Sequence, residues 1–429
     1  MGLPAEKQDL TEARLAAMQM PSGAAWAEAA RADALSRFRA MGLPGPRDEY
    51  WRFTKPAALN AIGAASTAFA DKEAKLPFED TDRLKIVFRD GVFDAEASDD
   101  LALEGIEIEL LSTAMDTDIH WAKDMYGTLE TAGQTPVARP FAALNTAFAT
   151  DGVVIRASKP VSRPVSLAYL HEKADSDAIL HFVIKVEAGA SLTVLENGPA
   201  AARFNKCMEI DVADNAQFHH VRAQGRDHDR LAVTHLFARL GEESVFKSFT
   251  LTANGKLTRN EAFIQINGDN ATAHIAGAAV GDGDFHHDDT VFITHDAVNC
   301  ESRQVFKKVL KNGAVGTFQG KILVKEGAQK TDGYQISQSL LLDDDAQFLA
   351  KPELEIYADD VICSHGSTTG AIDETALFYF RSRGIPVADA QDLLVLAFLA
   401  ESIEEIEDEA IAADILSHLE TWLIRHREK

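Results

Sequence analysis

The sequence predicts a mainly β protein, a right-handed parallel β-helix (solenoid) flanked by N-terminal and C-terminal helical domains. Three observations lead to this fold class. From about residue 151, short apolar strands alternate with polar corners that carry one small residue each. The first four small corner residues recur at steps of 26, 28 and 27 positions. Helical periodicity precedes and follows this region.

The repeat is clearest in its first four copies. Their small corner residues are Ala190, Ala216, Ser244 and Ala271. In the first three copies, apolar residues stand at equal distances before the corner, as Phe182, Met208 and Leu236 do. Stacked coils would pile such side chains into one interior column, and parallel crossovers are nearly always right-handed. In the fourth copy Ile264 and Ile266 are offset by one residue, which we expect the longer corner to absorb.

Similar corners recur later with less regular spacing, at 311–315, 325–329 and 343–347. An antiparallel sandwich is the competing architecture. It ranks second because it has no reason to repeat at a fixed period.

The flanking regions divide the chain into three predicted domains. Residues 1–150 form a mostly helical domain that contains RDEYWRFT (47–54), whose aromatic side chains are expected to anchor the helices to the body. Residues 151–372 form the β-helix core. Residues 373–429 carry two amphipathic helices separated by the acidic stretch 404–410, and this hairpin either caps the solenoid or docks a partner.

Composition limits the possible partners. The net charge of −25 makes nucleic acid and anionic membranes unfavourable. No apolar run approaches the roughly 18 residues of a membrane span, and the first ten residues lack a signal-peptide core, so we expect a cytoplasmic protein. Three widely spaced cysteines suit a reducing compartment and argue against a disulfide framework.

One stretch brings together residues that bind metals. In KPELEIYADDVICSHGSTTG (351–370), Cys363 and His365 stand two positions apart, so on a strand they share a face. A thiolate and an imidazole suit iron or zinc, but two ligands do not close a site, and another residue or another chain must complete it. The alternative is a buried structural cysteine beside a histidine that caps a turn.

Other chemistry is weaker or absent. HHDDTVFITH (286–295) is a second metal candidate, but strand alternation sends His286 and His287 to opposite faces. No sequence motif for nucleotide binding or catalysis is complete, so the chain is expected to be non-catalytic. Two alternatives are a β-solenoid carbohydrate-active enzyme, with Asp359 and Asp360 as its carboxylates, and a purely structural solenoid.

Long runs of the C-terminal half resemble the SufB/SufD family of iron–sulfur cluster assembly scaffold proteins. These runs are HDAVNCESRQVFKKVL (295–310), FQGKILV (318–324), AQKTDGYQ (328–335), Leu340–Leu342, the 351–370 stretch and FYFRSRGI (378–385). RDEYWRFT is similar to the entry motif of the same family. Within the family, the length and the cysteine-poor N-terminal region look more like SufD than SufB.

The resemblance implies a SUF-system scaffold subunit that pairs with SufB through the β-helix. The C-terminal helices would bind the SufC ATPase, and Leu419 and Trp422 are the docking candidates. Sulfur would come from a cysteine desulfurase system. A transient iron–sulfur cluster would form at the SufB–SufD interface, with His365 as the favoured ligand and Cys363 as the second candidate. Family members are associated with reduced flavin, for which this sequence has no motif. Without SufB, the strand edge that meets it would stay open, so we expect that the isolated chain can form homodimers.

Overall fold

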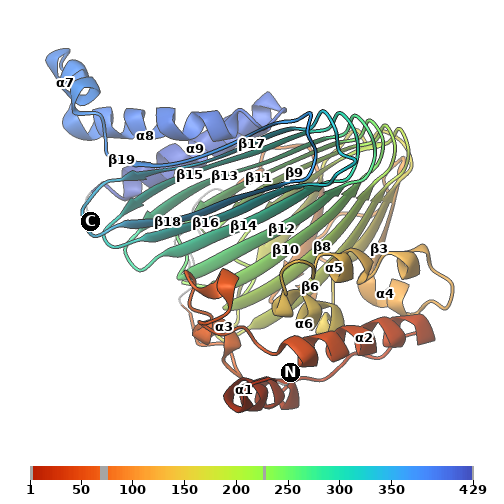
Figure 1. The fold of residues 1–429 in the computed structure, drawn as a ribbon. Helices are drawn as coiled ribbons and strands as arrows, with labels where there is room; N and C mark the ends of the chain where they lie inside the picture. The colour runs from red at the N-terminus through yellow and green to blue at the C-terminus, as the bar shows by residue number, and fades with distance from the viewer. Residues whose placement is uncertain (1–2, 68–75, 226–228, 428–429) are drawn as a thin grey trace.

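Two β-sheets wound together into a solenoid form the body of the protein (Figure 1). The computed structural model describes residues 3–67, 76–225 and 229–427. Among these residues, ten strands form sheet A and nine form sheet B. Helices flank the solenoid at both ends of the chain, so the predicted mainly β fold with a parallel β-solenoid core is confirmed.

Sheet A has the strand order β19-β17-β15-β13-β11-β9-β7-β5-β1-β2. Its strands are β1 (Leu84–Arg89), β2 (Val92–Phe93), β5 (Val165–Leu170), β7 (Ser191–Asn197), β9 (Gln217–Gln224), β11 (Val245–Ala253), β13 (Thr272–Asp282), β15 (Glu301–Lys311), β17 (Asp332–Leu341) and β19 (Ile362–Gly370).

Sheet B has the order β18-β16-β14-β12-β10-β8-β6-β4-β3. Its strands are β3 (Ile106–Leu110), β4 (Val153–Ala157), β6 (Asp177–Val186), β8 (Arg203–Val212), β10 (Leu231–Leu240), β12 (Leu257–Ile266), β14 (His286–His295), β16 (Val315–Val324) and β18 (Gln347–Ile356). Apart from the β1–β2 and β3–β4 pairs, these strands run parallel.

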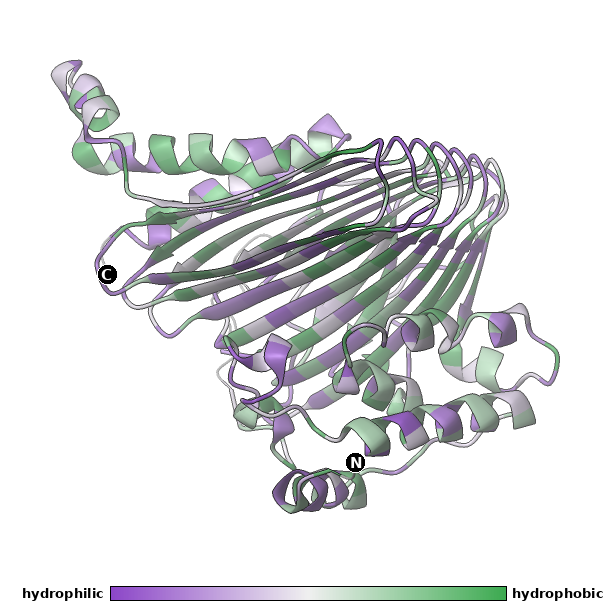
Figure 2. Cartoon of the chain, viewed as in Figure 1, coloured by the Kyte–Doolittle hydropathy of each residue, from purple (hydrophilic) through white to green (hydrophobic). Residues whose placement is uncertain are grey.

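The predicted interior column is present in full. Met208 of β8 pairs in register with Phe182 of β6 and Leu236 of β10, and all three side chains are buried. Figure 2 shows hydrophobic and hydrophilic residues alternating along the strands, as one buried face requires. The fourth copy behaves as expected, because Ile264 and Ile266 pair in register with Ala238 and Leu240 and the corner that follows, 267–271, is one residue longer than the corner 241–244.

The recurring corner before the strands of sheet A contains a residue with a left-handed backbone conformation. The residues with positive φ at this position are Gly189, Asn215, Glu243, Asn270, Asn299 and Lys330. Each donates its backbone N–H to a carbonyl of the next coil, as Asn270 does to Val298 at 3.0 Å. Glycine and asparagine tolerate this conformation best, so the corners select them.

The coils lengthen along the solenoid. The first residues of β7, β9, β11, β13, β15, β17 and β19 follow one another at steps of 26, 28, 27, 29, 31 and 30 residues. The later coils place Cys300 and Thr331 where the earlier ones have alanine or serine, and both are buried. Two of the later corners read from the sequence, at 311–315 and 343–347, do not continue this series before sheet A. Their alanines, Ala314 and Ala346, directly precede strands of sheet B.

Helices cover the outer faces of the two sheets (Figure 1). The N-terminal elements are α1 (Ala5–Ala16), α2 (Ala25–Met41), the 3-10 turn η1 (Glu49–Trp51), α3 (Ala57–Asn60), α4 (Leu111–Asp116), η2 (Trp121–Asp124), α5 (Thr128–Ala132) and α6 (Pro140–Phe148). Phe141 and Leu144 of α6 pack against Leu231 and Val233 of sheet B. The C-terminal helices are α7 (Glu374–Ser382), α8 (Val387–Ile403) and α9 (Glu409–Arg425), and α8 and α9 pack on sheet A.

The aromatic segment 47–54 anchors the N-terminal helices, as predicted. The hydroxyl of Tyr50 donates to Glu353 of β18 at 2.5 Å. The ring of Trp51 packs edge-on against Phe141, and the guanidinium of Arg259 lies 4.2 Å from the Trp51 ring centre. Within the described ranges we find no helix whose length and apolar content would let it cross a membrane.

Buried charges fill one side of the solenoid interior. Glu196 accepts hydrogen bonds from Tyr169 at 2.6 Å and His220 at 2.7 Å, and it also pairs with the ammonium of Lys206. Burial works against the charged carboxylate, but Lys206 and nearby cations outweigh it and hold the pKa of Glu196 well below its usual range. Burial lowers the pKa of Lys206 to about 8.

We predict that Ile210→Ala lowers the free energy of unfolding by about 2–4 kcal/mol, because it leaves a cavity in the interior column. Chemical denaturation of the isolated chain measures this loss. Ile362→Ala is the matched control, since that side chain is 73% exposed. Equal stability of the Ile210 variant and the parent would contradict the interior register.

Stability is also predicted to fall as pH drops from about 6.5 to about 4. Burial lowers the pKa of His295 to about 4, so over this range the unfolded chain binds a proton that the folded chain excludes. This single imidazole corresponds to roughly 3 kcal/mol. His295→Gln should reduce the slope of the unfolding free energy against pH in this range by the equivalent of about one bound proton. His365→Gln, at an exposed ring, is the control. An unchanged slope in the His295 variant would refute the assignment.

Candidate functional site

The solenoid ends at two strands with unpaired edges, which we call the open end. β18 and β19 are the last strands of sheets B and A, and each pairs with one neighbour in the described chain. Ile356, Tyr357 and Ile362 expose large apolar or aromatic side chains here. An unpaired, partly apolar strand edge is a template for pairing with another chain.

Cys363 faces the solenoid interior at the open end. It pairs in register with Gly333 of β17, and a methyl group placed on that glycine would lie 3.2 Å from the Cys363 sulfur. The thiol packs against an apolar cluster that contains Ile322 and Leu354. Burial is the main cause that raises the pKa of Cys363, so the neutral thiol is favoured in the isolated chain.

His365 lies on the same face of β19 and is exposed. Ser367 and Thr369, two and four positions further along the strand, share this face and point inward. Ser367 bonds to Ser337 at 2.9 Å and Thr369 bonds to Ser339 at 3.2 Å. The ring is accessible because β19 is the last strand of sheet A in the part of the chain that the structure describes. The structure thus places Cys363 and His365 on one face, as their spacing predicts.

The described chain does not supply a complete metal site. Its residues contain no cluster of three or more histidine, cysteine, aspartate or glutamate side chains that could hold a metal. Cys207 and Cys300 are buried, and burial raises the pKa of both thiols.

The second metal candidate, 286–295, forms structural contacts instead. His287 faces the interior, where Lys308 lies 2.9 Å from its Nδ1 atom and 2.6 Å from Asp289. His286 faces the opposite side and contacts Thr54 at 3.2 Å. The predicted split of the two histidines between faces is confirmed.

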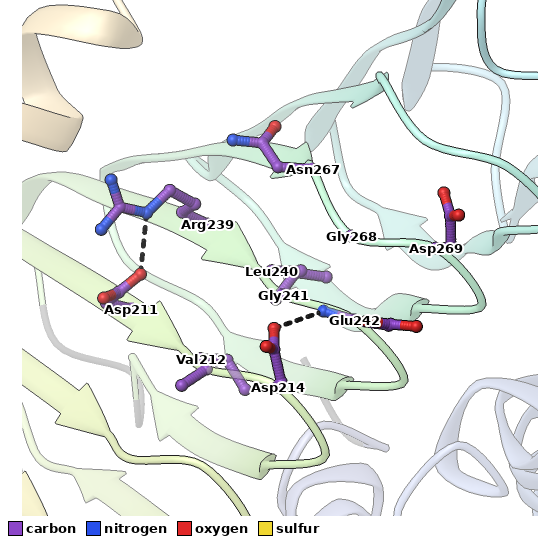
Figure 3. Close-up of a pocket in the computed structure, with 11 residues that line it drawn as sticks. Asp211, Val212, Asp214, Arg239, Leu240, Gly241, Glu242, Asn267, Gly268 and Asp269 are labelled. Carbon is purple, nitrogen blue, oxygen red and sulfur yellow. Dashed lines mark hydrogen bonds and ion pairs between the residues drawn. The ribbon is translucent and has the colours of Figure 1, made fainter.

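Asp359 and Asp360 lie in the turn between β18 and β19 and are exposed. The turn geometry is set by the backbone of Asp360, whose N–H donates to the Gln329 side chain at 3.0 Å. A hollow of about 540 Å³ lies elsewhere, between the ends of β8, β10 and β12 (Figure 3). Its Asp211 pairs with Arg239 at 2.8 Å.

The C-terminal hairpin buries both predicted docking residues. Leu419 is 0% exposed and Trp422 is 3% exposed, and they pack with sheet A residues such as Phe249 and Leu251. We therefore revise the prediction: these two side chains attach α9 to the solenoid and are covered within the monomer. The exposed aromatic residues of this region are on α7, where Phe378 is 69% and Tyr379 is 52% exposed.

An acidic turn reinforces the attachment of the hairpin. On the outer face of sheet A, His219, Lys247, His274 and Arg303 stand in register on successive strands. Glu407 contacts His219 at 3.1 Å and Lys247 at 2.5 Å, and Glu405 contacts His274 at 2.9 Å. The stretch 404–410 is therefore paired with a basic row of the solenoid.

Comparison with known proteins identifies the family. Residues 169–398, more than half of the chain, match the domain described as SUF system FeS cluster assembly, SufBD core domain. The chain belongs to the SufBD family.

Relatives match over most of their lengths. The iron–sulfur cluster assembly protein SufD of Escherichia coli (strain K12) is 29% identical over 406 residues, which covers 90% of each chain. SufD of Bacillus subtilis (strain 168) is 26% identical over 421 residues, covering 92% of this chain and 94% of the relative. A SufBD family protein of Synechocystis is 30% identical over 404 residues, 87% of this chain and 86% of the relative.

The SufBD match covers the strands from the end of β5 to β19 and continues into α8. It therefore includes the open end and the first part of the hairpin. Sequence reasoning missed α7 as a separate helix with exposed aromatic residues. Its signals are the Asp373 side chain, which caps the helix start, and the aromatic pair Phe378 and Tyr379. Membership in the SufBD family gives the carbohydrate-active alternative no support.

We predict that Leu419→Ala lowers the free energy of unfolding by about 2–5 kcal/mol, because it removes a buried contact between α9 and sheet A. Hydrogen exchange should show faster opening of α8 and α9. Leu393→Ala on α8, 46% exposed, is the matched control. Normal stability and protection in the Leu419 variant would contradict the packing described above.

Proposed function

We propose that this chain is the SufD-type scaffold subunit of a SUF complex that assembles iron–sulfur clusters in the cytoplasm. It pairs with SufB at the open end and with the SufC ATPase through its C-terminal helices. The observation that carries the proposal is an accessible imidazole, His365, on a strand whose outer edge has no partner among the described residues. Family membership supports the iron–sulfur role.

The open end suits a second solenoid. Its edge strands offer backbone N–H and C=O groups to another chain, and the exposed Ile362 and Tyr357 offer apolar area. In this arrangement His365 faces the seam, where it binds iron of the nascent cluster while SufB supplies thiolate. Cys363 remains the second ligand candidate. The same edges explain how the isolated chain would form homodimers when SufB is absent.

The chain itself acts as a non-catalytic scaffold. Iron and sulfide are the cargo, and sulfur comes from a cysteine desulfurase system. ATP chemistry comes from SufC, since this sequence has no complete nucleotide motif. Reduced flavin is an expectation of the family resemblance, and we assign none of the residues of this chain to it.

SufC would act on the open end through sheet A. α8 and α9 are attached to this sheet by buried apolar contacts and by the paired acidic turn, and β19 is the last strand of the same sheet. A pull on the hairpin by ATP-bound SufC would therefore move the sheet that carries His365 rather than peel the hairpin away. A crosslink that freezes the SufB seam while cluster formation continues would contradict this mechanism.

We predict that His365→Ala reduces cluster formation by the reconstituted complex at least tenfold. The readouts are iron and sulfide content and the visible absorption of the purified complex. Because the ring is exposed, the melting temperature and the retention of SufB should stay unchanged. Ser364→Ala, an exposed neighbour on the opposite face of the strand, is the control. Full cluster content in the His365 variant would refute the ligand role.

We further predict that Phe378→Ala weakens SufC binding at least tenfold, since this α7 side chain is exposed and aromatic and such residues dominate interfaces. Titration calorimetry with purified SufC measures the affinity. The melting temperature should not change. Val92→Ala, at a 62% exposed position of sheet A far along the solenoid from α7, is the control. Equal affinity of the Phe378 variant and the parent would place SufC on another surface.

A further inference from the structure

A column of two glutamines leads through the interior to the candidate ligand. Gln304 of β15 pairs in register with Gln335 of β17, which pairs in turn with His365 of β19. All three belong to the inward-facing set of sheet A. The two glutamines are fully buried, whereas the imidazole at the end of the column is exposed.

The two amides lack hydrogen-bond partners. Neither the side-chain oxygen nor the side-chain nitrogen of Gln304 or Gln335 has a partner in the described chain. Stacked glutamines in register usually bond to each other along a parallel sheet, and each buried unpaired polar atom costs about 1–3 kcal/mol. Such groups call for a specific explanation.

Gln335 stands between two polar side chains in register, Gln304 on one side and His365 on the other. Across the interior stands Gly320 of β16, where a methyl group would lie 2.7 Å from the Gln335 amide oxygen. The hydroxyl of Ser337, two residues on, is already bonded to Ser367. Adjacent strands are about 4.8 Å apart, so side-chain rotation brings the His365 ring to the Gln335 amide.

We propose that Gln335 is a positioning residue for His365. Its amide oxygen accepts the N–H of the ring nitrogen that faces the interior, which fixes one tautomer. The other nitrogen, which carries a free lone pair, then points to the open end. Metal-binding histidines are oriented in this way by a second hydrogen bond, whose loss typically costs 10–100-fold in affinity. This inference rests on the proposed function of His365 as a ligand.

The test uses Gln335→Met, which keeps the length of the side chain and removes its hydrogen-bonding atoms. Gln338→Met, on the opposite face of the same strand, is the matched control. In the isolated chain, long-range proton–nitrogen NMR correlations report the tautomer of the His365 ring. We expect one dominant tautomer in the parent and in Gln338→Met, and a mixture of both in Gln335→Met.

In the reconstituted complex, Gln335→Met should lower cluster content by at least fivefold and Gln338→Met should not. The melting temperature of Gln335→Met should change little, since the loss of one hydrogen bond to an exposed ring is offset by the removal of a buried amide nitrogen that has no partner. A lower melting temperature with an unchanged tautomer would indicate a merely structural glutamine and overturn the inference.

The two hypotheses fail separately. If His365→Ala abolishes cluster formation while Gln335→Met leaves both the tautomer and the cluster content unchanged, the positioning role is wrong and the proposed function stands. If Gln335→Met changes the tautomer but His365→Ala leaves cluster formation intact, the ligand role is wrong and the amide–imidazole bond is supported on its own.

Discussion

Each inward-facing side chain of this solenoid must fit the side chains at the same position in the coils on either side. Paired strands lie about 4.8 Å apart, so a mismatch cannot be relieved by distance. The apolar column through Met208 meets this requirement by shape. The corners meet it with backbone hydrogen bonds from left-handed residues such as Asn270 to the next coil. Helices α8 and α9 on sheet A and α6 on sheet B pack on surfaces that this stacking creates.

The polar part of the interior meets the same requirement through charge. Glu196 holds Lys206 and His220, and Asp289 holds Lys308, each across neighbouring coils or across the two sheets. Such buried pairs contribute little net stability, but breaking one leaves an uncompensated charge, so they penalise a shifted register. Towards the open end the pairs give way to neutral amides and hydroxyls.

Part of this arrangement was accessible from the sequence and part was not. The period and the apolar column could be predicted because alanine or serine corners and β-alternation are local signals. Cys300 and Thr331 were missed as corners because neither residue type marks a turn, and the conformation needed comes from Asn299 and Lys330 before them. The amphipathic pattern of α9 predicts that Leu419 is covered, but it does not tell whether the solenoid or a partner covers it. The structure shows that sheet A covers this side chain. The exposure of His365 follows only from its strand being last in the stack.

The number of residues per coil increases toward the open end. The early turns use 26 to 28 residues and the last ones 29 to 31. The rim is therefore wider than the start of the rod. A sister chain that continues the winding must have rungs of about the same perimeter, near thirty residues, at the face it presents. A β-helix with narrower rungs would meet one strand edge and miss the other.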